Sequence, residues 1–175
     1  MNEVEIEGEF EGESLETQVP EEIFEKASQL ARDNSVYLSG PIRCVEDDGR
    51  GWRNDVIEQY GDEFEFHNPL DRYDPETMDI LSDPSNIDLD ADKQQVLPTE
   101  YVADDKRLMA QSEAVLLGLP EEIARGSLME AMWCSLHQIP VYAWTIEGQT
   151  ESGWLHVHAE IVSDDLDEVI SEMRG

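Results

Sequence analysis

Short apolar runs alternate with longer amphipathic segments along most of the chain. The apolar runs predict five strands, at residues 35–40, 63–69, 113–119, 139–145 and 154–162. Segments with apolar residues at helical spacing predict helices at residues 20–34, 51–61, 100–112, 126–138 and 164–174. Strands that alternate with helices form parallel sheets through right-handed crossovers. The pattern therefore predicts an α/β fold, a doubly wound, flavodoxin-like five-stranded parallel sheet with helices on both faces.

Two polar stretches lie outside this alternation. Residues 1–18 combine Glu with single apolar residues and Gly, and no Lys or Arg precedes Lys26. This composition is typical of a disordered acidic leader, so we expect a single α/β domain over residues 19–175. Residues 71–98 show no firm periodicity, which predicts a long loop of the kind that often covers a site.

The chain is strongly acidic, with 42 Asp and Glu against 11 Lys and Arg and a formal net charge of -31. The negative electrostatic potential around such a chain repels nucleic-acid phosphates, which argues against nucleic acid as a partner. A highly saline cytoplasm would explain the composition, because concentrated salt screens the self-repulsion. A decoy that mimics DNA and a disordered acidic tail are the alternatives. Acidic residues are spread along the whole chain, and this spread favours the saline interpretation.

Nothing in the sequence indicates a membrane or a secretory route. No run of about 18 apolar residues is present, and the first residues have neither the basic start nor the apolar stretch of a signal peptide. We therefore expect a soluble, cytoplasmic protein with no membrane partner. Cys44 and Cys134 lie far apart and outside any C-x-x-C pattern, so both thiols are expected to be free.

In open α/β sheets, ligands bind beyond the carboxyl ends of the strands. The segments that follow the first three predicted strands read GPIRCVEDDGRGWR, NPLDRYD and LPEEIARGSLMEA. The glycine fingerprint of dinucleotide-binding folds is absent, and so is the phosphate loop that ends in Gly-Lys-Ser/Thr. These segments therefore indicate a chemistry other than hydride transfer or ATP hydrolysis.

Five short segments follow one another as VYLSGPIR, HNPL, ADDKRLMAQSEAVLL, RGSLMEAMW and IPVYAW. In this order and spacing the chain resembles the nucleoside 2-deoxyribosyltransferase family, including its relatives that hydrolyse deoxynucleoside monophosphates, over about residues 35–173. The resemblance implies cleavage of the N-glycosidic bond of a 2-deoxynucleoside or its 5′-monophosphate, with transfer to a nucleobase or to water. It also implies no cofactor and a homodimer or larger assembly. A non-catalytic nucleotide-binding module is the alternative from another class.

The resemblance assigns the role of nucleophile to Glu130. Displacement at the anomeric carbon of deoxyribose passes through an oxocarbenium-like state, which a carboxylate can stabilise and then trap as a covalent sugar adduct. The same residue has a purely structural interpretation. Ser127 and Glu130 are spaced as a capping box, in which the glutamate completes the start of a helix. The positive end of that helix would also help to keep the carboxylate ionised.

Two further catalytic assignments follow from the resemblance. Tyr37 corresponds to a tyrosine that hydrogen-bonds the nucleophilic carboxylate, although an ordinary half-buried strand aromatic fits the pattern equally well. Asp104 corresponds to the aspartate that contacts the base and assists its departure, and Asp105 beside it is expected to contact the substrate. Both aspartates open a predicted helix, where either could be an N-cap.

The remaining substrate contacts are expected at the strand exits. Arg43, Arg50 and Arg53 cluster after the first predicted strand, and Arg forks bind phosphate oxygens, although surface ion pairs are the alternative. Asn68 could touch the sugar or the base, but Asn before Pro also favours turns. The complete set of expected substrate-binding residues is Ser39, Gly40, Arg43, Arg53, Asn68, Asp105, Gly126 and Ser127.

Two other pairs of residues could carry chemistry. His156 and His158 would share one face of a predicted strand, a spacing that can hold a metal, but no third ligand is evident. Cys134 and His137 lie three residues apart on a predicted helix with nothing to orient the histidine, so core packing is expected for Cys134. We therefore expect no metal site.

Overall fold

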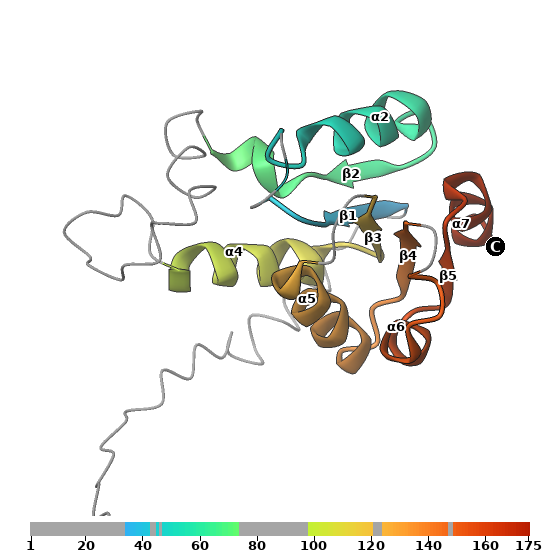
Figure 1. The fold of residues 1–175 in the computed structure, drawn as a ribbon. Coiled ribbons are helices and arrows are strands. Elements are labelled where there is room, and N and C mark those ends of the chain that lie inside the picture. Colours follow the sequence, from blue (N-terminus) through green and yellow to red (C-terminus); the bar gives the residue numbers. More distant parts are fainter. Residues whose placement is uncertain (1–33, 43–44, 46, 74–97, 121–123, 147–148) are drawn as a thin grey trace, which may run out of the picture.

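The structure is a five-stranded parallel sheet covered by helices (Figure 1). It is a computed structural model that describes residues 34–42, 45, 47–73, 98–120, 124–146 and 149–175. The strands are β1 (Ser35–Ser39), β2 (Glu65–His67), β3 (Ala114–Leu119), β4 (Val141–Thr145) and β5 (Ile161–Ser163). They lie in the order β2-β1-β3-β4-β5, and every neighbouring pair is parallel. This order confirms the predicted doubly wound, flavodoxin-like sheet.

Four of the predicted helices are present with bounds that differ by two residues or fewer. The helical elements are α2 (Arg50–Tyr60), the 3-10 turn η1 (Pro69–Arg72), α4 (Pro98–Gln111), α5 (Arg125–Leu136), α6 (Gly153–His158) and α7 (Leu166–Met173). In the part of the chain that the structure describes, no helix has the length and apolar composition needed to cross a bilayer. The acidic leader, the predicted helix at residues 20–34 and residues 74–97 of the predicted loop lie outside the described residues.

Apolar side chains are buried on both faces of the sheet. Val36 and Leu38 of β1 pack into one cluster with Val56 of α2 and Ile170 of α7. Tyr37, which alternates with them along β1, packs into a second cluster to which α4, α5 and α6 contribute. Accordingly, α2 and α7 lie on one face of the sheet and α4, α5 and α6 on the other (Figure 1). Strands buried on both faces are continuous apolar runs, which is why the sequence identified most of them.

The sequence prediction is wrong for residues 154–162. Residues Gly153–His158 form α6, and β5 begins only at Ile161. Parallel neighbours such as β4 and β5 need a crossover of about a dozen residues, and a strand that began at Trp154 would leave too few residues for it. The apolar residues here belong instead to a short helix, in which Leu155 is buried against the sheet.

The ring of Trp52 lies against the backbone of β1 and β3 near their carboxyl ends. A Cβ atom on Gly118 would lie 2.5 Å from this ring, and a Cβ on Gly40 would lie 2.5 Å from the ring and 2.6 Å from the Gly118 carbonyl oxygen. The ring also contacts the edge of Trp144, with 6.2 Å between centroids. Gly40, expected as a substrate contact, therefore has a packing role, because a side chain at this position would displace Trp52.

Gly118→Ala should lower the free energy of unfolding by about 1–3 kcal/mol, because the added methyl group overlaps the Trp52 ring. Gly126→Ala is the matched control. No atom outside its own helix lies within 4 Å of that Cβ position, and Ala is favoured over Gly in helices, so stability should rise by roughly 0.5–1 kcal/mol. Chemical denaturation measures both changes. A Gly118→Ala protein as stable as its parent would contradict the described contact.

Candidate active site

Polar side chains from four elements meet near the carboxyl ends of β1 and β3. These neighbouring strands lead to helices on opposite faces of the sheet, and such a topological switch point is where doubly wound folds bind ligands. Ser39 is the last residue of β1, and its hydroxyl donates a hydrogen bond to a carboxylate oxygen of Glu130 on α5 at 2.5 Å. Asp105 of α4 and Arg72 of η1 lie close enough to change the pKa of this carboxyl group.

Glu130 lies in the second turn of α5, as the sixth residue of the helix. The N-cap of α5 is Ala124, which makes no side-chain capping hydrogen bond, and Ser127 is a buried residue within the helix. The capping-box interpretation is therefore wrong, because it requires the helix to begin three residues later, with Ser127 as the N-cap. The carboxylate is oriented instead by the hydrogen bond from Ser39.

The environment of Glu130 disfavours its charged form. Burial, and after it the negative charge of Asp105, raises the pKa of Glu130 from 4.5 to about 7. The hydrogen bond from Ser39 and the positive charges of Arg53 and Arg72 act in the opposite direction but are weaker. At neutral pH this half-buried carboxyl group therefore exchanges its proton readily, which suits a group that takes part in chemistry.

Asp105 has different partners from Glu130. Its carboxylate forms a close ion pair with Arg72, and it also accepts a hydrogen bond from the hydroxyl of Tyr37. Burial nevertheless raises the pKa of Asp105 above its ordinary value, although both partners lower it. The pKa of Tyr37 is raised by burial first and then by the charges of Glu130 and Asp105. Tyr37 is thus a neutral donor that hydrogen-bonds the aspartate, rather than the glutamate as the resemblance implied.

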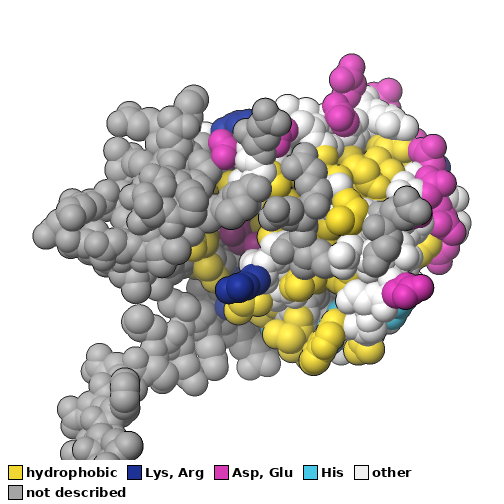
Figure 2. Space-filling model, in the orientation of Figure 1, with side chains coloured by type: hydrophobic (Ala, Val, Ile, Leu, Met, Phe, Trp, Pro, Cys, Tyr) yellow, Lys and Arg dark blue, Asp and Glu magenta, His cyan; other side chains and the backbone are white. Residues whose placement is uncertain are grey.

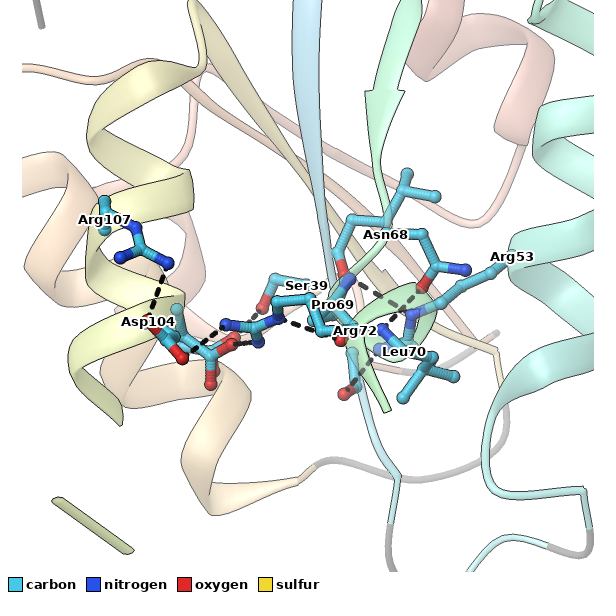
Figure 3. A network of polar contacts seen from close by, with 12 residues as sticks. Ser39, Arg53, Asn68, Pro69, Leu70, Arg72, Asp104 and Arg107 are labelled. Atoms are coloured by element: carbon cyan, nitrogen blue, oxygen red, sulfur yellow. Dashed lines mark hydrogen bonds and ion pairs between the residues drawn. The ribbon is translucent and has the colours of Figure 1, made fainter. Parts of the chain in front are cut away.

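Asp104 lies at the edge of this cluster and has ion pairs of its own. Its carboxylate lies 2.7 Å from Arg107 and 3.8 Å from Arg72, and its side chain is 40% exposed. Figure 3 shows Arg72 reaching from η1 toward Asp104, with Arg107 on the far side of the aspartate. Because α4 begins at Pro98, neither Asp104 nor Asp105 is its N-cap. The structure brings Asp105, and not Asp104, to Tyr37 and Glu130.

Arg72 is a residue of the cluster that sequence reasoning did not select. Its Nε donates to the carbonyl of Pro69 at 3.2 Å, and its guanidinium lies over the ring of Tyr73 at 5.1 Å. Its Nη1 is buried and lies 3.8 Å from the Asp104 carboxylate, without a hydrogen-bond partner. A signal was available, because Arg72 is one of only 11 basic residues and stands at a strand exit in NPLDRYD.

Arg53 supports the loop that follows β1. The side chain is fully buried, and burial lowers its pKa to about 10. Its guanidinium donates, at 2.7–3.4 Å, to the backbone carbonyls of Leu38, Gly40, Pro41 and Gly49. These bonds use most of the five donors of an Arg fork. Arg53 therefore shapes the loop beside Ser39 and does not present a free fork to a phosphate.

The other expected substrate contacts that the structure describes have local structural roles or positions. Asn68 acts as the N-cap of η1, since its Oδ1 accepts from the backbone amide two residues on, at 3.1 Å, and its Nδ2 donates to Asp71 at 3.0 Å. This is the turn role that Asn before Pro also predicted. Gly126 is exposed in the first turn of α5, and Ser127 is buried next to it. Arg43 lies outside the described residues.

The histidine pair does not share a strand face. His156 and His158 lie on α6, where Nε2 of His156 is 2.5 Å from the carbonyl oxygen of Thr150 and Nδ1 of His158 is 3.1 Å from the hydroxyl of Ser135. Across the described ranges, no group of three or more His, Cys, Asp or Glu is arranged to hold a metal. Cys134 is buried in the core, and burial raises the pKa of its thiol, which fits a packing role.

No family model matches the chain, and no curated protein sequence matches it. A solved structure described as a conserved protein from Enterococcus faecalis V583 is similar, with 13% sequence identity and a TM-score of 0.48 over 79% of this chain and 87% of that chain. Its description names no activity, and a similarity of this size carries no argument about function. The resemblance to nucleoside 2-deoxyribosyltransferases stays a prediction.

Glu130→Gln should stabilise the fold at pH 8 but hardly at pH 4.5. The pKa of Glu130 in the folded protein, about 7, lies above its ordinary 4.5. Between these values the unfolded chain releases a proton that the folded protein retains, so stability falls as the pH rises through this window and then levels off. Gln cannot ionise, and the variant should exceed its parent at pH 8 by up to about 3 kcal/mol.

Urea unfolding at pH 4.5 and pH 8, in one salt concentration, measures this difference. Glu58→Gln, at an exposed position of α2, makes the same substitution on the surface and is the control, and the difference between the two values of pH should be much larger for Glu130→Gln. If the two variants gave the same difference, the Glu130 carboxyl group would not be buried as described.

Proposed function

We propose that this protein cleaves the N-glycosidic bond of a 2-deoxynucleoside or its 5′-monophosphate through a covalent deoxyribosyl adduct on Glu130, and transfers the sugar to another base. The observation that carries the proposal is a pair of carboxyl groups, Glu130 and Asp105, whose charges interact at the switch point of the sheet. Retaining glycosidic chemistry requires two such groups, one to attack the sugar and one to move a proton at the leaving group. The resemblance in sequence supplies the substrate class.

In the first step, an oxygen of Glu130 forms a bond to C1′ while the bond between C1′ and the base nitrogen breaks, and the electron pair leaves with the base. Protonated Asp105 gives its proton to the departing base. In the second step, a nitrogen of another base attacks C1′, Asp105 accepts its proton, and Glu130 leaves as a carboxylate. The two displacements together retain the configuration of the sugar.

The two roles require opposite protonation states. Glu130 must be ionised to attack. Burial and the charge of Asp105 raise its pKa to about 7, so a substantial fraction is ionised at neutral pH, and Ser39, Arg53 and Arg72 favour this form. The positive charge that develops on the sugar favours it further. Asp105 must carry a proton when the base departs. Burial, the largest influence on its pKa, raises that pKa against the opposing effects of Arg72 and Tyr37.

Hydrolysis of a deoxynucleoside 5′-monophosphate is the alternative within the same chemistry. In the described part of the loop after β1, the charged groups that could interact with a phosphate are engaged by the backbone of the protein itself. Arg53 donates to backbone carbonyls, and the Asp47 carboxylate accepts from the amides of Gly49, at 2.9 Å, and Gly51. The Asp47 carboxylate therefore lies at the start of α2, where the backbone amides of a helix would otherwise bind an anion such as a phosphate. These contacts favour the unphosphorylated nucleoside.

Incubation with a deoxynucleoside and a second base, followed by chromatography, tests the proposal. A new nucleoside indicates transfer, free deoxyribose indicates hydrolysis, and neither product indicates a non-catalytic nucleotide-binding module. The same assay with the 5′-monophosphate decides between the two substrates. We expect transfer, with the nucleoside as the better donor.

A 2-deoxy-2-fluoro-arabinosyl nucleoside should leave its sugar covalently attached to Glu130, because fluorine slows the second displacement by destabilising the oxocarbenium-like state. Intact-mass spectrometry should show the protein plus one fluoro-sugar, and peptide mapping should place it at residue 130. Glu130→Gln should form no adduct and should lose at least about 10³-fold in turnover while its circular dichroism is unchanged. Turnover retained by Glu130→Gln, or an adduct on another side chain, would refute the assignment.

Asp105→Asn should lower kcat/KM by roughly 10²- to 10⁴-fold, the usual contribution of a general acid. Asp104→Asn is the matched control on the adjacent residue of α4. It should change kcat/KM by less than threefold, because Asp104 is partly exposed and lies closer to Arg107, at 2.7 Å, than to Arg72, at 3.8 Å. A nucleoside with a base that leaves without protonation should restore most of the rate of Asp105→Asn. The reverse ranking of the two variants would assign the acid to Asp104.

A further inference from the structure

Arg53 is the largest side chain that is fully buried in the part of the chain that the structure describes. A guanidinium is seldom taken out of water unless a carboxylate pairs with it, because the burial of an unpaired charge is costly. The four hydrogen bonds of Arg53 go to uncharged backbone carbonyls instead. A neutral side chain could hold a loop at lower cost, so this charged fork of donors indicates a role beyond stability.

Two of these bonds hold the backbone on either side of Ser39. The Nε atom of Arg53 donates to the carbonyl of Leu38 at 3.4 Å, and Nη2 donates to the carbonyl of Gly40 at 2.9 Å. Both donors belong to one planar group, so the two carbonyls are held at a fixed separation. Ser39 lies between them and is the last residue of β1. Arg53 therefore fixes the backbone at the point where the strand ends.

The start of α2 leaves this guanidinium little freedom. Its Nη1 also donates to the carbonyls of Pro41, at 3.3 Å, and Gly49, at 2.7 Å. Gly49 has a φ of 70°, and a Cβ atom there would lie 2.6 Å from Nη1 of Arg53 and 2.1 Å from the Pro41 oxygen. The guanidinium also lies over the ring of Trp52, 4.5 Å from its centroid. The fork is thus held on several sides and acts as a rigid support.

Arg53 and Glu130 approach Ser39 from opposite faces of the sheet. The helix α2 covers the face on which Leu38 packs, and α5 covers the other face (Figure 1). Successive side chains along a strand point to opposite faces, so the Ser39 side chain points away from α2 and donates to Glu130 at 2.5 Å. Figure 3 shows Arg53 extending from α2 toward the end of β1, where Ser39 lies. The backbone of Ser39 therefore connects Arg53 with the candidate nucleophile.

We propose that Arg53 is a positioning residue for the candidate active site: it fixes the backbone around Ser39 and so keeps the Ser39 hydroxyl directed at Glu130. Its effect on catalysis rests on the proposed function of Glu130, whereas the contact itself is measurable without a substrate. A Lys at this position would keep the charge but would not bridge four carbonyls, because an ammonium is a point charge without a planar fork.

The charge of Arg53 also acts on the Glu130 carboxyl group, together with groups from several other elements. The groups that face this carboxyl are Asp105 of α4, which raises its pKa, Ser39 of β1, Arg53 of α2 and Arg72 of η1, which lower its pKa, and Tyr37 of β1 and Cys134 of α5, whose own pKa values its charge raises. An experiment on Arg53 must therefore separate the hydrogen bonds of its fork from its charge.

Arg53→Lys and Arg53→Gln make this separation in the transfer assay. Both should lower kcat by roughly 10- to 100-fold, the cost of a misplaced catalytic group. Both should keep KM within about threefold of the parent, because the contacts to the substrate remain. A loss in Arg53→Gln alone would mean that the charge suffices and would overturn the proposal. Arg174→Gln, the control, removes the exposed cation that pairs with Glu63 and should leave kcat within about twofold of the parent.

Ser39→Ala tests whether Arg53 acts through Ser39. By itself it should lower kcat to an extent similar to Arg53→Lys. The double variant should lose less than about threefold beyond the more damaging single substitution, because both substitutions disrupt the same contact. If Arg53 had a merely structural role, the two losses would multiply, and that result would overturn the proposal.

NMR of the Arg53 side-chain Nε–H group in the isotope-labelled full-length protein tests the contact without a substrate. Its signal should titrate with Glu130, whose pKa is about 7, and Glu130→Gln should abolish this titration. In Ser39→Ala the change in chemical shift should fall to about half or less, because coupling through Ser39 is reciprocal. An unchanged titration in Ser39→Ala would mean that Arg53 responds through space alone, and the positioning role would be wrong.

The NMR measurement leaves Arg53 in place, so it decides the question even where Arg53→Lys and Arg53→Gln do not fold. Coupling through Ser39 in a parent protein without turnover would refute the proposed function and support the contact. Turnover without this coupling would refute the positioning role and leave the proposed function intact.

Discussion

The candidate site depends on one partly buried carboxyl group, that of Glu130. Glu130 lies on the inner side of α5 and accepts the hydrogen bond of Ser39 at the end of β1. This contact joins α5, the helix between β3 and β4, to β1, which lies beside β3 in the sheet. Burial raises the pKa of Glu130 to about 7, so the fold tolerates a costly ionisation at the position where doubly wound sheets bind ligands. A merely structural carboxylate would gain more from facing solvent.

The few basic residues of the chain have specific tasks near this group. Arg53 is buried and binds the backbone carbonyls of the loop after β1, so it shapes the backbone next to Ser39. Arg72 pairs with Asp105 and moderates the repulsion between this aspartate and Glu130. Nearby cations offset part of the repulsion between two carboxyl groups that approach each other in a chain of net charge -31.

The two sides of α5 differ in what they face. The inner side presents Glu130 and Cys134 to the sheet, and the outer side presents Met129 and Leu136 to solvent. The acidic composition of the chain would repel nucleic-acid phosphates, and its suitability for a saline interior stays a prediction.

The sequence by itself determined the elements whose periodicity is local. Runs such as SVYLS and AVLLGL are buried on both faces, and this burial leaves an apolar signature that is readable without a structure. It also identified Glu130 as exceptional in its surroundings. The tertiary structure decided where segments begin and which way their side chains point. Whether residues 154–162 formed a strand depended on the room that a crossover needs, and whether Ser127 capped a helix depended on where α5 begins. The choice between Asp104 and Asp105 depended on the rotation of 100° per residue around α4, which points neighbouring side chains in different directions. The role of Arg72 depended on the contact between η1 and α4, which are distant in sequence and meet only in the folded chain.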